Sequence, residues 1–206
     1  MRVVLRVWLL LVCLTGTAWA AQPGHTVLVF GDSLSAGYGL AREQSWPALL
    51  DQRLKKDAPD YTVANASISG DTTTNGVNRI GPALARFKPA VVIVALGGND
   101  GLRGGSVDTM RSNLEAIIAA CRKAGARVLL AGIRMPPNYG SAYAEKFQAV
   151  YADIAKRLKV PVVPYLLEGF GENRELFQAD GIHPTAKAQP MIVDTVWKGL
   201  RPLLVK

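Results

Sequence analysis

Three polar side chains of the sequence have the types and the order that catalysis by a hydroxyl nucleophile needs. Ser33 follows an apolar run, and Asp180 and His183 lie three residues apart in a short turn-like segment near the carboxyl end. A hydroxyl nucleophile requires a base that takes its proton and an acceptor that orients this base. One turn can present Asp180 and His183 to the same cleft, so we predict a catalytic triad of Ser33, His183 and Asp180.

Each of these residues also has an ordinary structural interpretation. A serine between a strand and a helix often only caps the helix, and an aspartate can cap a turn that carries a solvated histidine. His25, the second histidine, precedes the first predicted strand, and we expect it at the surface. The combination favours catalysis, since every required group occurs in an appropriate place. The motifs of ordinary α/β-hydrolases, phosphate-binding loops and complete dinucleotide-binding loops are missing from the sequence.

The elements that must position these residues alternate along the chain. Short apolar runs predict strands at 26–30, 61–66, 90–96, 127–133 and, as a short edge strand flanked by prolines, at 160–164. Helices are predicted at 46–55, 75–87, 110–121, 147–158 and 185–203. This alternation predicts an α/β fold with a doubly wound parallel sheet of five strands, and such sheets bind ligands at the carboxyl ends of their strands.

Three consecutive predicted strands end in loops of small and polar residues. These loops are Gly31–Ser35, Asn65–Asp71 and Gly97–Gly101. A purely structural loop needs only a glycine and one or two polar residues. Because the carboxyl ends of parallel strands meet at one edge, three such loops together indicate a functional site there.

Four segments together resemble the SGNH, or GDSL, hydrolase family. The blocks Gly31–Ser35, Ser69–Asp71, Gly97–Asp100 and Asp180–Pro184 occur in the order of the family and span most of the chain. The similarity is closest to its periplasmic acyl-CoA thioesterases, which are also lysophospholipases and arylesterases, and it includes segment 133–140. The resemblance implies a three-layer, flavodoxin-like fold, acyl-chain substrates and no metal or other cofactor.

On this resemblance, the backbone N–H groups of Ser33 and Gly70 and the side-chain amide of Asn99 form the oxyanion hole. A glycine at position 70 lets the backbone approach the substrate closely. Segment 72–78, which contains Gly76, is interpreted either as a mobile lid or as an ordinary surface loop. Three further acidic residues next to the site are predicted to organise turns (Asp32, Asp71 and Asp100). The predicted walls of the acyl groove are Leu102, Met135, Pro136 and Tyr139.

The amino terminus differs in composition from the rest of the chain. Two arginines, an apolar run and the segment Ala18-Trp19-Ala20 predict a cleaved signal peptide at 1–20, followed by one hydrolase domain at 21–206. The alternatives are an uncleaved anchor and a buried helix. We therefore expect a periplasmic or secreted protein. Val12 before Cys13 argues against a lipoprotein, and Cys121 is predicted to be a buried small hydrophobic residue.

The whole chain carries a formal charge of +8, but its basic residues are scattered and form no dense patch. We therefore predict no nucleic-acid partner, at most peripheral contact with lipid surfaces, small-molecule acyl ester or thioester substrates, and a monomer. The first alternative function is a carbohydrate acetyl-esterase. It is disfavoured because Trp46 and Trp197, the tryptophans outside the signal peptide, fall in predicted helices. The second alternative is a non-catalytic module that binds lipid or nucleotide.

Overall fold

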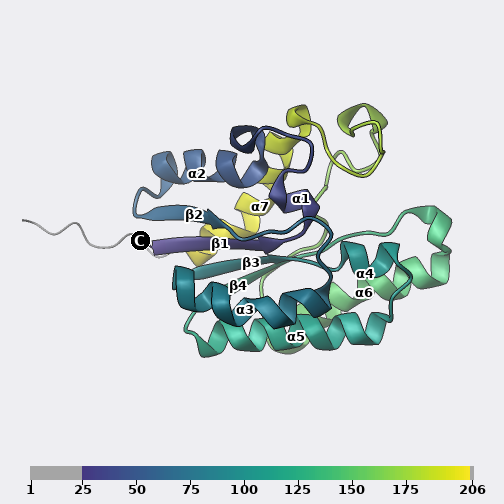
Figure 1. Ribbon diagram of the computed structural model, residues 1–206, viewed down its shortest axis with the longest axis horizontal. Helices are drawn as coiled ribbons and strands as arrows, with labels where there is room; N and C mark the ends of the chain where they lie inside the picture. The colour runs from purple at the N-terminus through teal and green to yellow at the C-terminus, as the bar shows by residue number, and fades with distance from the viewer. Residues whose placement is uncertain (1–24, 205–206) are drawn as a thin grey trace, which may run out of the picture.

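The computed structural model describes residues 25–204, which form a five-stranded parallel sheet between two layers of helices (Figure 1). The strand order is β2–β1–β3–β4–β5, the order of flavodoxin-like folds. The strands are β1 (His25–Gly31), β2 (Tyr61–Asn65), β3 (Val91–Ala95), β4 (Arg127–Ala131) and β5 (Val162–Val163). The predicted fold class is thus confirmed. The predicted signal peptide lies outside the described residues.

The burial of the strands follows from their place in the sheet. Strand β3 lies between β1 and β4, and all five of its residues are buried, as its continuous apolar sequence predicts. Strand β5 pairs only with β4 and has two residues, because Pro161 and Pro164 on either side of it have no N–H group for the ladder. The chain therefore places its most apolar strands at the centre of the sheet.

Helices cover both faces of the sheet (Figure 1). On one face lie α2 (Trp46–Asp57) and α7 (Gln189–Leu200), and on the other lie α3 (Thr73–Phe87), α5 (Val107–Lys123) and α6 (Ser141–Leu158). Two short helices follow strands directly at the carboxyl edge of the sheet, α1 (Ser33–Ala36) after β1 and α4 (Gly98–Leu102) soon after β3. No helix of residues 25–204 is long and apolar enough to cross a membrane.

Helix α5 shows how the sequence pattern sets a helix. The Ser106 hydroxyl accepts the N–H of Thr109 at 3.2 Å and so caps the amino end. Gly125, just beyond the carboxyl end, has a φ of +81°, a left-handed conformation that glycine adopts without strain. The buried stripe is Met110, Leu114, Ile117, Ile118 and Cys121. Cys121 is fully buried, so the prediction of a buried small hydrophobic residue is confirmed, and burial raises the pKa of its thiol to about 12.

Several predicted bounds differ from the structure: α6 begins at Ser141 and not at residue 147, and β5 has two residues and not five. Helix α7 begins at Gln189 and not at residue 185, and Pro190 lies in its first turn, where no N–H is needed. Segment 72–78 belongs mostly to α3, with the Thr72 hydroxyl accepting the N–H of Asn75. An added Cβ at Gly76 would lie 2.7 Å from the Leu96 side chain, so this glycine permits packing against the core. The interpretation of this segment as a surface loop is therefore wrong, and the predicted helix begins at Thr73 and not at Asn75.

Candidate active site

The side chains of Ser33, His183 and Asp180 form a chain of contacts at the carboxyl edge of the sheet. His183 Nε2 lies 2.8 Å from Ser33 Oγ, and His183 Nδ1 lies 2.7 Å from Asp180 Oδ2. Ser33 is the first residue of α1, whereas the other two residues come from a turn that precedes α7. With the imidazole proton on Nδ1, the Nε2 lone pair faces the hydroxyl. The structure thus brings together the three residues predicted as a triad.

Asp180 is held by its own turn. Its Oδ1 atom accepts the backbone N–H groups of Ile182 at 2.9 Å and of His183 at 3.0 Å, and Gly181, which directly follows Asp180, has a φ of +68°. The backbone N–H of His183, its side chain and the N–H of Ile182 lower the pKa of Asp180 to about 2. The carboxylate therefore stays ionised over the pH range of an esterase assay and remains an acceptor for the imidazole.

The turn that carries His183 is tied to the loop after α1. Gln178 Nε2 donates to the carbonyl of Tyr38 at 2.8 Å and to that of Pro184 at 3.2 Å, and its backbone N–H donates to His183. The Tyr38 ring lies 4.4 Å from the imidazole ring, centroid to centroid. Neither Gln178 nor Tyr38 was predicted from the sequence as a site residue. The position of an aromatic residue between two glycines, Gly37 and Gly39, could have indicated a functional role for Tyr38. The residues around Gln178 contain no comparable feature.

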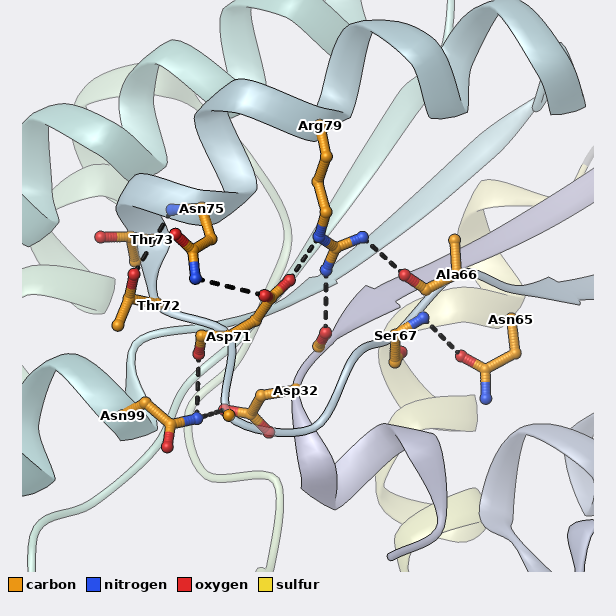
Figure 2. A network of polar contacts seen from close by, with 12 residues as sticks. Asp32, Asn65, Ala66, Ser67, Asp71, Thr72, Thr73, Asn75, Arg79 and Asn99 are labelled. Atoms are coloured by element: carbon orange, nitrogen blue, oxygen red, sulfur yellow. Dashed lines mark hydrogen bonds and ion pairs between the residues drawn. The ribbon is translucent and has the colours of Figure 1, made fainter.

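The three predicted oxyanion donors come from three different loops. The backbone N–H groups of Ser33 and Gly70 donate to no atom of residues 25–204, so both are free to bind a substrate. Gly70 has a φ of +82°, a left-handed conformation that glycine adopts without strain, and this explains why a glycine stands at position 70. Asn99 Nδ2 donates to the carbonyl of Asp71 at 2.9 Å and faces Asp32 Oδ2 at 3.4 Å (Figure 2).

Arg79 fixes these loops to one another. Its guanidinium pairs with the Asp71 carboxylate and donates to the carbonyls of Ala66 at 2.6 Å and of Gly31 at 3.0 Å (Figure 2). It also lies 3.9 Å above the centre of the Phe30 ring. One cation on α3 therefore holds Gly31 at the end of β1, Ala66 just after β2, and Asp71, the last residue of the second predicted block. The sequence analysis did not single out this residue.

Of the acidic residues beside the triad, Asp32 organises a turn, as predicted, whereas Asp100 and Asp71 hold separate elements together. Asp32 Oδ1 accepts the N–H of Leu34 at 3.1 Å and caps α1. Asp100 accepts the N–H of Thr73 at 2.8 Å and its hydroxyl at 2.6 Å, which joins α4 to α3. Asp71 is held by the guanidinium described above. None of the three contacts the imidazole within residues 25–204, which leaves Asp180 as its carboxylate partner.

Asp32 is the most perturbed of these carboxyl groups. Its side chain is 2 % exposed. Burial, with smaller contributions from the charges of Asp71 and Asp100, raises its pKa to about 7, although the N–H of Leu34 opposes the shift. The folded protein therefore keeps a proton that the unfolded chain loses near pH 4. The contribution of this group to stability falls as the pH rises from about 4 to 7.

Replacing Asp32 with asparagine should remove this pH dependence. We expect the Tm of the variant, relative to that of the wild type, to rise by several degrees between pH 4 and pH 7.5, since a domain of this size gains about 2–4 °C per kcal/mol. Differential scanning calorimetry at constant ionic strength measures it. A Tm difference that stays constant over this range would show that Asp32 titrates as in the unfolded chain.

The predicted walls of the acyl groove divide into two groups. The Tyr139 hydroxyl donates to the carbonyl of Leu102 at 3.1 Å, both side chains are half-buried, and Pro136 is exposed. Met135 is buried, and an added Cβ at Gly101 would overlap its sulfur. The glycine thus leaves room for the Met135 side chain, which packs in the core.

Three exposed hydrophobic residues lie on segments at or near the triad. Among residues 25–204, the large hydrophobic side chains that are exposed are Tyr38 at 53 %, Ile68 at 51 % and Ile182 at 44 %. Tyr38 contacts the imidazole, Ile182 directly precedes His183, and the N–H of Ile68 donates to the carbonyl of Gly31 at 3.0 Å. Their exposure, on segments that also carry the triad or the second predicted block, marks them as candidates for contact with an apolar substrate.

The chain is similar to known proteins in both sequence and structure. The sequence model of the GDSL-like lipase/acylhydrolase family matches residues 29–189. The chain is 50 % identical to esterase TesA of Pseudomonas aeruginosa, over 95 % of this chain and 96 % of that protein. It is 43 % identical to thioesterase 1/protease 1/lysophospholipase L1 of Escherichia coli strain K12, over 96 % and 92 % of the two chains. A crystal structure of TesA superposes with a TM-score of 0.85 at 49 % identity, covering 87 % of this chain and all of that one.

Proposed function

The chain belongs to the GDSL-like lipase/acylhydrolase family, and from this premise we propose that it is a serine hydrolase of carboxylic esters and thioesters. The observation that carries the proposal is the contact chain from Ser33 Oγ through the imidazole of His183 to Asp180, with separations of 2.8 and 2.7 Å. A hydroxyl, a base and an orienting carboxylate in this order are the parts of an acyl-transfer site.

The first half of the reaction acylates Ser33. Its Oγ attacks the acyl carbonyl while His183 Nε2 takes the hydroxyl proton, and Asp180 stabilises the imidazolium that forms. The N–H groups of Ser33 and Gly70 and the Asn99 amide donate to the oxyanion. The tetrahedral intermediate then collapses, the C–O or C–S bond breaks, and the imidazolium protonates the leaving alcohol or thiol.

The second half releases the acyl group as a carboxylic acid. The leaving group has departed, and a water molecule takes its place beside the imidazole. His183 removes a proton from this water as it attacks the ester carbonyl, and the same three donors stabilise the second oxyanion. The proton returns to Ser33 Oγ when the intermediate breaks down. None of these steps needs a metal ion or an organic cofactor.

Replacing Asn99 with alanine should lower kcat by about 10²–10³-fold, because one of three oxyanion donors is lost while substrate binding in the ground state changes little. Steady-state kinetics with p-nitrophenyl butyrate measures this. Asn78→Ala, an exposed position on α3, is the matched control and should keep the wild-type kcat. A kcat of Asn99→Ala within twofold of the wild type would remove Asn99 from the oxyanion hole.

The substrates in this proposal are small molecules with apolar acyl chains. The names of the relatives, an esterase and a thioesterase/lysophospholipase, support ester and thioester substrates such as aryl esters, acyl-CoA and lysophospholipids. The exposed side chains of Tyr38, Ile68 and Ile182, on segments at or near the triad, support an apolar acyl chain. The same proposal takes residues 21–206 as one periplasmic or secreted domain that acts as a monomer and meets lipid surfaces only peripherally.

Two substrate series test this function. Purified protein lacking residues 1–20 is assayed with p-nitrophenyl esters from acetate to palmitate and with acyl-CoA thioesters of matched lengths. Turnover of both series supports the proposal, and the dependence of kcat/KM on chain length measures the length of the acyl site. Turnover of acetyl esters alone would favour the carbohydrate acetyl-esterase. A folded protein without turnover would favour a module that binds lipid or nucleotide.

A further inference from the structure

Asp32 connects the turn of the nucleophile with helix α4. Its Oδ1 atom accepts the N–H of Leu34 at 3.1 Å, and its Oδ2 atom faces Asn99 Nδ2 at 3.4 Å (Figure 2). A Cβ added to Gly98, the first residue of α4, would lie 3.3 Å from Oδ2, so the carboxyl group packs closely against this helix. With 2 % exposure, the Asp32 side chain fills the space between two of the loops that carry proposed catalytic groups.

The contacts of Asn99 define the orientation of its amide. A side-chain amide has two donors at one end and an acceptor at the other. The carbonyl of Asp71 is an acceptor, and so is Asp32 in its carboxylate form, which prevails above its pKa of about 7; both lie at the nitrogen end. A rotated amide would place its oxygen against these two acceptors. Because Asp32 directly precedes Ser33, the second acceptor keeps one N–H on the side of the nucleophile.

The two donor–acceptor distances of the Asn99 amide differ, and the difference would allow one of its N–H groups to change acceptor. The bond from Asn99 to the Asp71 carbonyl, at 2.9 Å, has ordinary length, whereas the contact with Asp32 is long at 3.4 Å. The first contact therefore anchors the amide, and the second only directs it. An oxyanion that forms on the acyl carbon at Ser33 can accept a hydrogen bond from the N–H group that faces Asp32. Only the long contact with Asp32 is then lost, and no strong hydrogen bond is broken.

We propose that Asp32 is a positioning residue that acts through Asn99, holding its amide so that one N–H points to the oxyanion. The inference rests on the oxyanion role of Asn99 in the proposed function. A carboxyl group is suited to it because one oxygen caps α1 at Leu34 while the other faces the amide. An asparagine at position 32 has one oxygen for these two partners, and a serine caps the helix but is too short to reach Asn99.

A double-mutant cycle separates this role from capping. Asp32→Asn and Asp32→Ser are each made in the wild type and in Asn99→Ala, and kcat and KM are measured with p-nitrophenyl butyrate. In the wild type, each change should lower kcat by about tenfold, within the coupling range of residues in contact, and leave KM within about twofold. In Asn99→Ala, neither change should lower kcat further, since the amide that Asp32 orients is gone.

Other outcomes overturn the inference. If Asp32→Asn and Asp32→Ser lower kcat by the same factor in both backgrounds, Asp32 acts on Ser33 or on the fold and not through Asn99. If both variants keep the wild-type kcat, Asp32 has no positioning role. If Asn99→Ala alone keeps the wild-type kcat, the proposed oxyanion role of Asn99 fails, and the role of Asp32 fails with it. Thermal unfolding of Asp32→Ser, which retains the cap, verifies that the variant is folded.

Discussion

Alanine in place of Ser33 should lower kcat for esters and thioesters by about 10⁴-fold or more, because no acyl-enzyme can form without the hydroxyl. The Oγ atom of Ser33 is the hydroxyl that contacts His183 Nε2 within residues 25–204. The change should leave the fold intact, since Asp32 caps α1 through the N–H of Leu34 and not through the serine side chain. The remaining activity would come from substrate binding and the oxyanion donors.

Two measurements test this expectation. Steady-state kinetics gives the loss of kcat, and mass spectrometry after reaction with an alkyl phosphonate ester should show a covalent adduct on the wild type and none on Ser33→Ala. Ser112→Ala, which removes an exposed hydroxyl on α5, is the control and should retain both activity and labelling. Labelling of Ser33→Ala, or a kcat within tenfold of the wild type, would assign the nucleophile to another residue.

Asparagine in place of Asp180 should lower kcat by about 10⁴-fold, the magnitude known for the wrong histidine tautomer in a catalytic triad. The oxygen of the new amide can still accept the N–H groups of Ile182 and His183, so the turn is kept. The NH₂ group, however, is then directed at His183 Nδ1, which must become an acceptor. The imidazole proton moves to Nε2, and Nε2 can no longer accept the proton of Ser33.

The control for this change is another aspartate with an ion pair. Asp153 pairs with Arg111 at 3.2 Å, and its side chain is 57 % exposed, so Asp153→Asn tests the loss of a surface carboxylate. It should keep the wild-type kcat. If Asp180→Asn retained wild-type kcat as well, the imidazole would be oriented by some other group, and the contact of 2.7 Å would be structural.

The fold was predictable wherever long periodic segments specify it. The buried strand 91–95 and the stripe of helix α5 were visible as an apolar run and as three- and four-residue spacing. The short helices α1 and α4 were not predicted, because four or five residues are too few for a period. Local features form them: the cap by Asp32 and the left-handed Gly97, with a φ of +120°.

The site was predictable to the extent that its residues lie in local blocks. Ser33, Gly70, Asn99 and the turn with Asp180 each lie in a short loop of distinctive composition. The residues whose side chains connect these loops in the folded protein lie outside the blocks, in segments without a distinctive composition. Arg79 reaches a carbonyl 48 positions away, and Gln178 reaches one 140 positions away, so only the folded chain shows what they contact. For the same reason, the packing of Met135 against Gly101 could not be read from spacing.

Asp180 and His183, the orienting carboxylate and the base of the triad, belong to one turn. Asp180 holds both the imidazole and the backbone N–H of His183, so the two residues shift together as a rigid body. The nucleophile belongs to a different segment, and Gln178 ties that turn to the segment at Tyr38. Small displacements of the turn therefore preserve the pairing of His183 with Asp180. They change mainly the distance between His183 Nε2 and Ser33 Oγ, so activity would be lost through this one distance.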